Sequence, residues 1–187
     1  MKTPRILAFG GSLRRDSYNH KLATLAVRGA RGAGAQVTLI RLRDYPLPVF
    51  DEDFEKESGM PENAVKLKKL FKDHDALLIA SPEYNGGMSA ALKNVIDWVS
   101  RATEDNEPPL SVLKGKSAAI LSASPGGLGG SRGLDMLRTQ LEHIRIEVIK
   151  SQVTVPKVHE VMDEDGELKD AKLQAAVLDL GAKLAGK

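Results

Sequence analysis

Residues 9–19 read FGGSLRRDSYN and lie between two segments with different hydrophobic patterns. Before them, residues 5–9 form a short apolar run that predicts a buried strand. After them, apolar or small side chains recur at the spacing of a helix that packs on a sheet. These are Leu22, Leu25, Ala26 and Gly29. A strand, a turn of small residues and a helix start bring backbone N–H groups and the positive end of the helix dipole to one point. The pattern therefore predicts an anion-binding loop.

The side chains of this loop favour one kind of anion. Ser12, Ser17 and Asn19 offer neutral hydrogen bonds, and Arg14 offers a charge-assisted one. The loop lacks the Gly-Lys-Ser/Thr ending of a Walker A loop and the Gly-x-Gly-x-x-Gly pattern of dinucleotide-binding loops. A terminal monophosphate suits it better. The loop alone leaves one alternative open, an ordinary turn in which a Ser or Asp caps the helix and the arginines face solvent.

Composition excludes several classes of protein. The chain has 187 residues, 42% hydrophobic and 28% charged, which is ordinary for one globular domain covering residues 1–187. The formal net charge of +2 gives no support to a nucleic-acid partner or an anionic membrane surface. The absence of cysteine excludes disulfides, thiol nucleophiles and thiolate-bound metals. A strand begins almost at once, and no apolar run approaches the roughly 20 residues of a membrane span. We therefore expect no signal peptide and a cytoplasmic location.

Four further strands are predicted from β-branched or continuous apolar runs, at residues 36–42, 76–80, 117–122 and 146–155, the last of them irregular. Amphipathic stripes predict the helices between and after the strands, one of which takes Pro61 as its first residue. We expect the acidic segment 52–59 to be mobile. Residues 163–166, DEDG, lack the later ligands of a calcium loop and predict a polar turn.

Five strands that alternate with five helices predict an α/β fold, with a doubly wound five-stranded parallel sheet and helices on both faces. In the strand order 2-1-3-4-5, the chain reverses direction between strands one and three, and a crevice opens there at the carboxyl ends. Loops rich in glycine and serine follow strands one, three and four. The topology gathers these three loops at one place, which favours the phosphate interpretation over the ordinary turn.

The second and third loops suit a planar ring. Tyr84 offers a stacking face, Asn85 offers both a donor and an acceptor, and Pro82 stiffens the entry to the second loop. At residues 122–127, small residues of the third loop let a ring lie against backbone. A monophosphate, a spacer and a planar ring describe flavin mononucleotide (FMN). Taken singly, the second loop also fits a plain turn and helix cap, and the third fits a flexible tether.

On these motifs, the chain resembles the NAD(P)H-dependent FMN reductases, a family of flavodoxin-like proteins that includes bacterial quinone and chromate reductases and some azoreductases. The most specific matches are GSLR at residues 11–14 with Ser17 and Asn19, and SPEYNG at residues 81–86. Further matches are PLP at 46–48 with Asp51, LKN at 92–94 with Asp97 and Trp98, GK at 115–116 and SPGG at 124–127. Together the matches cover nearly the whole chain in order.

The resemblance implies a set of cofactor contacts. It implies that the FMN phosphate is held by Ser12, Arg14, Ser17 and Asn19, in a loop that also brings Gly11 and Tyr18 to the cofactor. It implies contacts to the isoalloxazine ring from Pro82, Glu83, Tyr84, Asn85 and Gly86. The same ring would be flanked by Ser122, Ser124, Gly126 and Gly127. Arg101, near the end of a helix, would contact the substrate or a partner subunit; the alternative is a cation that satisfies the helix C-terminus.

The resemblance also implies an activity. NADPH or NADH would pass hydride to flavin N5 and leave, and a quinone, azo compound, metal oxyanion or free flavin would then take the electrons in a ping-pong cycle. We expect no side chain to act as acid or base, and no metal site. The protein would be a homodimer or homotetramer that acts on a small-molecule electron acceptor.

Two other functions stay open. A flavodoxin-type electron carrier would bind FMN without oxidising NAD(P)H directly, but such carriers tend to be strongly acidic and this chain is near neutral. A nucleotide- or phosphosugar-binding enzyme would use the first loop without flavin and would leave Tyr84 and Asn85 unexplained. The sequence indicates neither the physiological acceptor nor the choice between NADPH and NADH.

Overall fold

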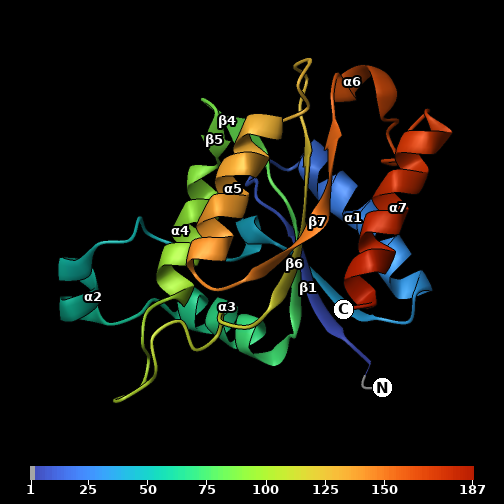
Figure 1. The fold of residues 1–187 in the computed structure, drawn as a ribbon. Helices are drawn as coiled ribbons and strands as arrows, with labels where there is room; N and C mark the ends of the chain where they lie inside the picture. The colour runs from blue at the N-terminus through green and yellow to red at the C-terminus, as the bar shows by residue number, and fades with distance from the viewer. Residues whose placement is uncertain (1–2) are drawn as a thin grey trace.

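The computed structural model describes residues 3–187 and has a five-stranded parallel sheet at its centre (Figure 1). Its strands are β1 (Arg5–Gly10), β2 (Gln36–Arg41), β3 (Ala76–Ala80), β6 (Ser117–Ala123) and β7 (Glu147–Val155). Their order in the sheet is β2-β1-β3-β6-β7, and each neighbouring pair is parallel. Counted along these five strands alone, the order is 2-1-3-4-5, which confirms the predicted topology and fold class.

Helices cover both faces of the sheet. One face carries α1 (Tyr18–Gly32) and α7 (Ala171–Ala185); the other carries α3 (Glu62–Asp73), α4 (Ala90–Val99) and α5 (Ser131–His143). Successive side chains of a strand point to opposite faces. Ile6 and Ala8 of β1 therefore join the core under α1 and α7, whereas Leu7 and Phe9 join the core under the other three helices.

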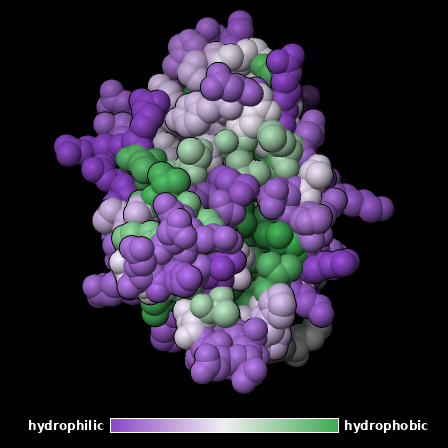
Figure 2. Space-filling model, turned by 90° about the vertical axis from the view of Figure 1, so that its left-hand side faces the viewer, coloured by the Kyte–Doolittle hydropathy of each residue, from purple (hydrophilic) through white to green (hydrophobic). Residues whose placement is uncertain are grey.

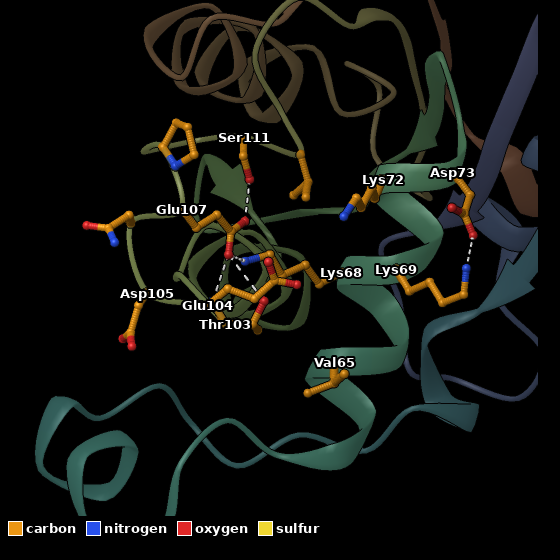
Figure 3. A pocket seen from close by; sticks show the side chains of 13 residues that line it. Val65, Lys68, Lys69, Lys72, Asp73, Thr103, Glu104, Asp105, Glu107 and Ser111 are labelled. Carbon is orange, nitrogen blue, oxygen red and sulfur yellow. Dashed lines mark hydrogen bonds and ion pairs between the residues drawn. The ribbon is translucent and has the colours of Figure 1, made fainter.

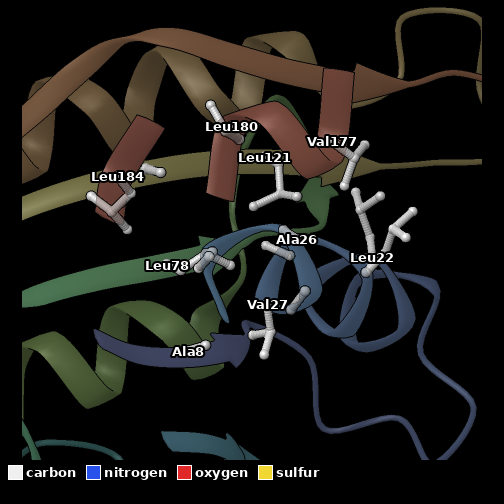
Figure 4. Close-up of a cluster of buried hydrophobic side chains, with 14 of the residues drawn as sticks. Ala8, Leu22, Ala26, Val27, Leu78, Leu121, Val177, Leu180 and Leu184 are labelled. Carbon is white, nitrogen blue, oxygen red and sulfur yellow. The ribbon is translucent and has the colours of Figure 1, made fainter. Parts of the chain in front are cut away.

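Helices α1 and α7 cross in close contact (Figure 4). A Cβ atom on Gly29 would lie 1.9 Å from the carbonyl oxygen of Leu178, and one on Gly181 would lie 2.0 Å from the carbonyl oxygen of Ala26. Only glycine allows two backbones to approach this closely. Leucine, valine and alanine side chains from both helices and from the sheet pack around the crossing. Because α1 begins at the predicted anion-binding loop, this crossing holds the helix that follows the loop.

The segment after β2 contains a helix that the sequence patterns do not predict. Residues 52–59, which the sequence predicts to be mobile, contain a helix, α2 (Glu52–Ser58), that projects from the body of the molecule (Figure 1). Asp51 caps this helix, because its Oδ1 accepts hydrogen bonds from the N–H groups of Asp53 at 2.8 Å and Phe54 at 3.3 Å. Acidic side chains in the first turn also suit the positive end of the helix dipole.

Smaller differences concern the ends of elements. Pro61 is the N-cap of α3 and not its first residue, because its ψ of 144° is extended. The predicted irregularity of the last strand is confirmed by a register shift between β6 and β7 at Ala118 and Ile120. Four more short elements have no counterpart in the prediction: α6 (Val158–Val161), the 3₁₀ helix η1 (Leu42–Asp44), and the strands β4 (Glu83–Tyr84) and β5 (Gly87–Met88), which form a hairpin. Within residues 3–187, no helix combines the length and the apolar character that a bilayer span requires.

Candidate functional site

A small cleft of about 70 Å³ opens where β1, β3 and β6 end. All three predicted loops contribute to it: its walls are Ser12, Arg14, Ser17, Tyr18, Asn19, Pro82, Glu83, Tyr84, Ala123, Ser124 and Pro125. The structure thus brings together nine of the residues singled out from the sequence. Five further predicted residues lie in the same loops but do not line the cleft: Gly11, Asn85, Gly86, Gly126 and Gly127. Ser122 lies near the end of β6 and does not line the cleft either. Ala123 and Pro125 also line the cleft; both fall within the third loop at residues 122–127, but neither was singled out as a contact.

The first loop presents hydrogen-bond donors to the cleft. Ser17 is the N-cap of α1, and its Oγ accepts from the His20 N–H at 3.3 Å. This leaves the N–H groups of Tyr18 and Asn19 without an acceptor inside the helix. Helix α1 has no acidic residue in its first turn, so its positive end is not neutralised there. The guanidinium of Arg14 is exposed and makes no ion pair with any group in residues 3–187. Such an arrangement can bind an anion.

The side chain of Asn19 holds two loops together. It is buried, its Nδ2 donates to the carbonyl oxygen of Ala123 at 2.9 Å, and its Oδ1 accepts from the Ala123 N–H at 2.9 Å. The amide joins the start of α1 to the end of β6. The phosphate contact implied by the resemblance would therefore have to share an amide that is already engaged in two hydrogen bonds. No local sequence signal indicates this role, because the partners are 104 residues apart.

The second loop is a tight hairpin. Asn85 and Gly86 both have positive φ, 54° and 78°, as the turn that best joins two short antiparallel strands requires. Tyr84 is 53% exposed, so its side chain is accessible to a ligand. After the hairpin, Ser89 caps α4: its Oγ accepts from the Leu92 N–H at 3.1 Å and donates to the carbonyl oxygen of Gly11. This second bond joins the hairpin to the first loop.

The third loop combines an exposed tip with a buried base. At the tip, Ser124 Oγ accepts from the Gly126 N–H at 3.1 Å, which rounds the loop. At the base, Ser122 is fully buried, and its Oγ has no hydrogen-bond partner in the described chain. A Cβ atom on Gly130 would lie 1.9 Å from that oxygen. Ser122 therefore faces the start of α5 and not the cleft.

Arg101 lies outside the cleft. Its Nε donates to Glu55 Oε2 at 2.9 Å, and its guanidinium carbon lies 5.2 Å from the centroid of the Phe50 ring. The hydrogen bond that Arg101 donates to the Glu55 carboxylate raises the pKa of Arg101. Its side chain thus fastens α2 to the end of α4. It borders a different hollow of about 600 Å³, together with Met60 and Val65.

Another hollow, of about 560 Å³, lies between α3 and residues 103–112 (Figure 3). Its most buried contact is the ion pair of Lys68 and Glu107, with 2.6 Å between Nζ and Oε2. Burial alone would raise the pKa of Glu107, but hydrogen bonds from Lys68, Ser111 and the Thr103 N–H outweigh it and lower the pKa to about 2. The pair holds the segment after α4 against α3. Neither residue belongs to a sequence motif.

Large apolar side chains are exposed on and next to α2. Figure 2 shows the side from which α2 projects, where apolar patches lie between hydrophilic side chains. Val49, next to α2, is 83% exposed, and Phe54 of α2 is 39% exposed. Within residues 3–187, no three His, Cys, Asp or Glu side chains cluster in a way that could hold a metal ion.

Known proteins resemble this chain in sequence and in fold. The profile of a family described as NADPH-dependent FMN reductase matches residues 4–160. An NAD(P)H-dependent FMN reductase of Pseudomonas aeruginosa is 34% identical over 92% of this chain and 89% of its own. A probable NADPH:quinone oxidoreductase of Oryza sativa is 32% identical over 96% and 86%. Among solved structures, FerB of Paracoccus denitrificans, a flavoenzyme NAD(P)H:(acceptor) oxidoreductase, superposes with a TM-score of 0.76 at 29% identity over 98% of both chains.

Proposed function

The chain belongs to the NADPH-dependent FMN reductase family and is an FMN-dependent NAD(P)H oxidoreductase, and on this basis we propose that the three-loop cleft holds the FMN phosphate. The observation that carries the proposal is the convergence of the Ser12 and Ser17 hydroxyls, the Arg14 guanidinium and the first turn of α1 on one cleft. These are the donors that suit a phosphate.

The size of the cleft supports the same assignment. At about 70 Å³ it is far smaller than the roughly 300–1,000 Å³ of a pocket that encloses a drug-sized ligand. It fits a phosphate group, and the ring would then lie outside it, on the surface formed by the second and third loops. Tyr84 would stack on that ring, and the tip of the third loop at residues 124–127 would line its edge. When bound, FMN supplies hydride and electron transfer, which no side chain of the chain can perform.

We further propose that quinones are among the acceptors and that NAD(P)H and the acceptor use the ring surface in turn. The relative from Oryza sativa, a probable NADPH:quinone oxidoreductase, supports the first point. The exposure of Tyr84 supports the second, because a ligand beside it is accessible from solvent. Substrates that alternate on one surface would give ping-pong kinetics.

Flavin absorbance tests the proposal. The purified protein is mixed with FMN, freed of unbound FMN and then given NADPH without oxygen; we expect a bound-flavin spectrum that bleaches. Bound flavin that NADPH does not bleach would favour the electron carrier, and no bound flavin would favour the phosphosugar alternative.

A pair of variants tests the phosphate assignment. Arg14→Ala should weaken FMN affinity by about 1.5–3 kcal/mol, the scale of a hydrogen bond to a charged group. Arg15→Ala, which removes the same charge from the next exposed residue, should change the affinity much less. Equal affinities in wild type and Arg14→Ala would contradict the assignment.

We also propose that the protein forms a homodimer or homotetramer. Exposed Val49 and Phe54 on the projecting segment support self-association, because large apolar side chains gathered on a surface are typical of interfaces. Light scattering after size-exclusion chromatography measures the mass, and a monomer at micromolar concentration would refute this part of the proposal.

A further inference from the structure

Glu83 borders the cleft, yet its carboxylate is engaged elsewhere. Its Oε2 accepts a hydrogen bond from the Gly133 N–H at 3.0 Å, and Gly133 is the third residue of α5. The first N–H groups of a helix have no acceptor within the helix, and a carboxylate placed there also meets the positive end of the helix dipole. Glu83 therefore caps α5 from another segment of the chain.

Helix α5 needs this cap because its own N-cap residue cannot provide one. Gly130 occupies the N-cap position with φ of 89°, and α5 has no side-chain cap bond from that position. A Cβ atom on Gly130 would also lie 1.9 Å from Ser122 Oγ. The Ser, Thr, Asp or Asn that usually caps a helix is thus excluded. The third loop leads into α5 at Gly130, which has no side chain to accept a hydrogen bond. Glu83 supplies the acceptor for the N–H of Gly133 instead.

The hydrogen bond between Glu83 and Gly133 also fixes the position of the second loop. Glu83 begins β4, directly before Tyr84 and the left-handed turn at Asn85 and Gly86. Because residue 133 is glycine, the hairpin can lie on α5: a Cβ atom there would be 3.1 Å from Glu83 Cβ. The hydrogen bond to Gly133 therefore joins the second loop to the helix that the third loop enters.

We propose that Glu83 is a positioning residue, whose carboxylate caps α5 and so holds the turn at residues 84–86 in place beside the third loop. The proposal rests on the proposed function for the identity of the ligand. The family resemblance implies that Glu83 contacts the ring. The positioning role differs from that contact, because it depends on the oxygen of Glu83 that accepts from the Gly133 N–H more than on the negative charge of Glu83.

Two substitutions at Glu83 separate these roles. Glu83→Gln keeps a carbonyl oxygen that can accept from the Gly133 N–H, and Glu83→Ala removes it. Hydrogen exchange at the Gly133 amide of the apoprotein, followed by NMR, reports the cap, and quenching of FMN fluorescence reports cofactor binding. We expect Glu83→Ala to speed exchange and to raise the FMN Kd, each about 5–10-fold, and Glu83→Gln to stay within about threefold of wild type.

Glu62→Ala is the matched control. Glu62 lies in the first turn of α3, whose N-cap Pro61 makes no side-chain cap bond, and α3 follows no cofactor loop. This variant should leave FMN affinity unchanged, and a weaker affinity would show that any loss of helix stability affects the site.

Two results would overturn the positioning role. Equal loss of FMN affinity in Glu83→Gln and Glu83→Ala would indicate a charge contact with the ligand. Unchanged Gly133 exchange in Glu83→Ala would show that the carboxylate is not the cap. A wild-type protein that binds no FMN would instead refute the proposed function, and the exchange measurement would still decide whether the cap exists.

Discussion

Replacing Asn19 with alanine should destabilise the protein and weaken cofactor binding together. Asn19 is 4% exposed, and its amide exchanges two hydrogen bonds of 2.9 Å with the backbone of Ala123, which is 3% exposed. The variant leaves the buried N–H and C=O of Ala123 without these partners. Each such group costs about 1–3 kcal/mol, so the loss of both partners should lower the free energy of unfolding by about 2–6 kcal/mol. The FMN Kd should rise, because the first and third loops lose their connection.

Urea unfolding of the apoprotein measures the first effect, since a lower midpoint at an unchanged m-value reports stability. Asn63→Ala is the control: Asn63 is half-buried, donates one bond of 3.0 Å to the Pro46 carbonyl oxygen, and should cost less than about 1 kcal/mol. FMN titration of both variants measures the second effect. A wild-type urea midpoint in Asn19→Ala would refute the reasoning.

Three further predictions concern single polar side chains elsewhere in the fold. Glu107 has a folded-state pKa of about 2 against an ordinary 4.5, so its carboxylate should contribute about 3 kcal/mol of stability above pH 4.5. This contribution is lost as the pH falls towards 2. Urea midpoints measured across this pH range should therefore fall less steeply in Glu107→Gln than in wild type. Ser122→Ala removes a buried hydroxyl without a partner, so the free energy of unfolding should stay the same or rise by up to about 1–2 kcal/mol. The thermal midpoint measures this change, and FMN affinity should be unaltered. A lower midpoint would reveal a hidden partner of the hydroxyl. Arg101→Ala should lower the free energy of unfolding by about 1–2 kcal/mol through the lost contacts with Glu55 and Phe50, and faster cleavage of α2 by protease would confirm that these contacts hold it.

The sheet could be predicted from the sequence because each strand carries its own local signal. All five residues of β3 are apolar and buried, and the loops after β1, β3 and β6 carry small residues. Ser12, Arg14 and Ser17 could be singled out for the same reason, since they lie in one contiguous motif that the fold turns towards the cleft.

The contacts that hold the site together could not be predicted. Asn19 and Ala123 are 104 residues apart, and Glu83 and Gly133 are 50 apart, so no local pattern encodes either pairing. Helix α2 is a different case, because Asp51 is a local capping signal and the density of acidic residues outweighed it in the prediction.

The crossing of α1 and α7 has a consequence for the order of events during synthesis. Helix α1 leaves the ribosome before α7 is translated, and the part of its apolar face that α7 covers then has no partner. An isolated helix of this length is marginal in water. The C-terminal half of α1 therefore gains its final packing only when Gly181 and its neighbours close on Gly29 and Ala26. The final packing of α1 therefore waits for the translation of α7, whose first residue is 139 positions after the last residue of α1.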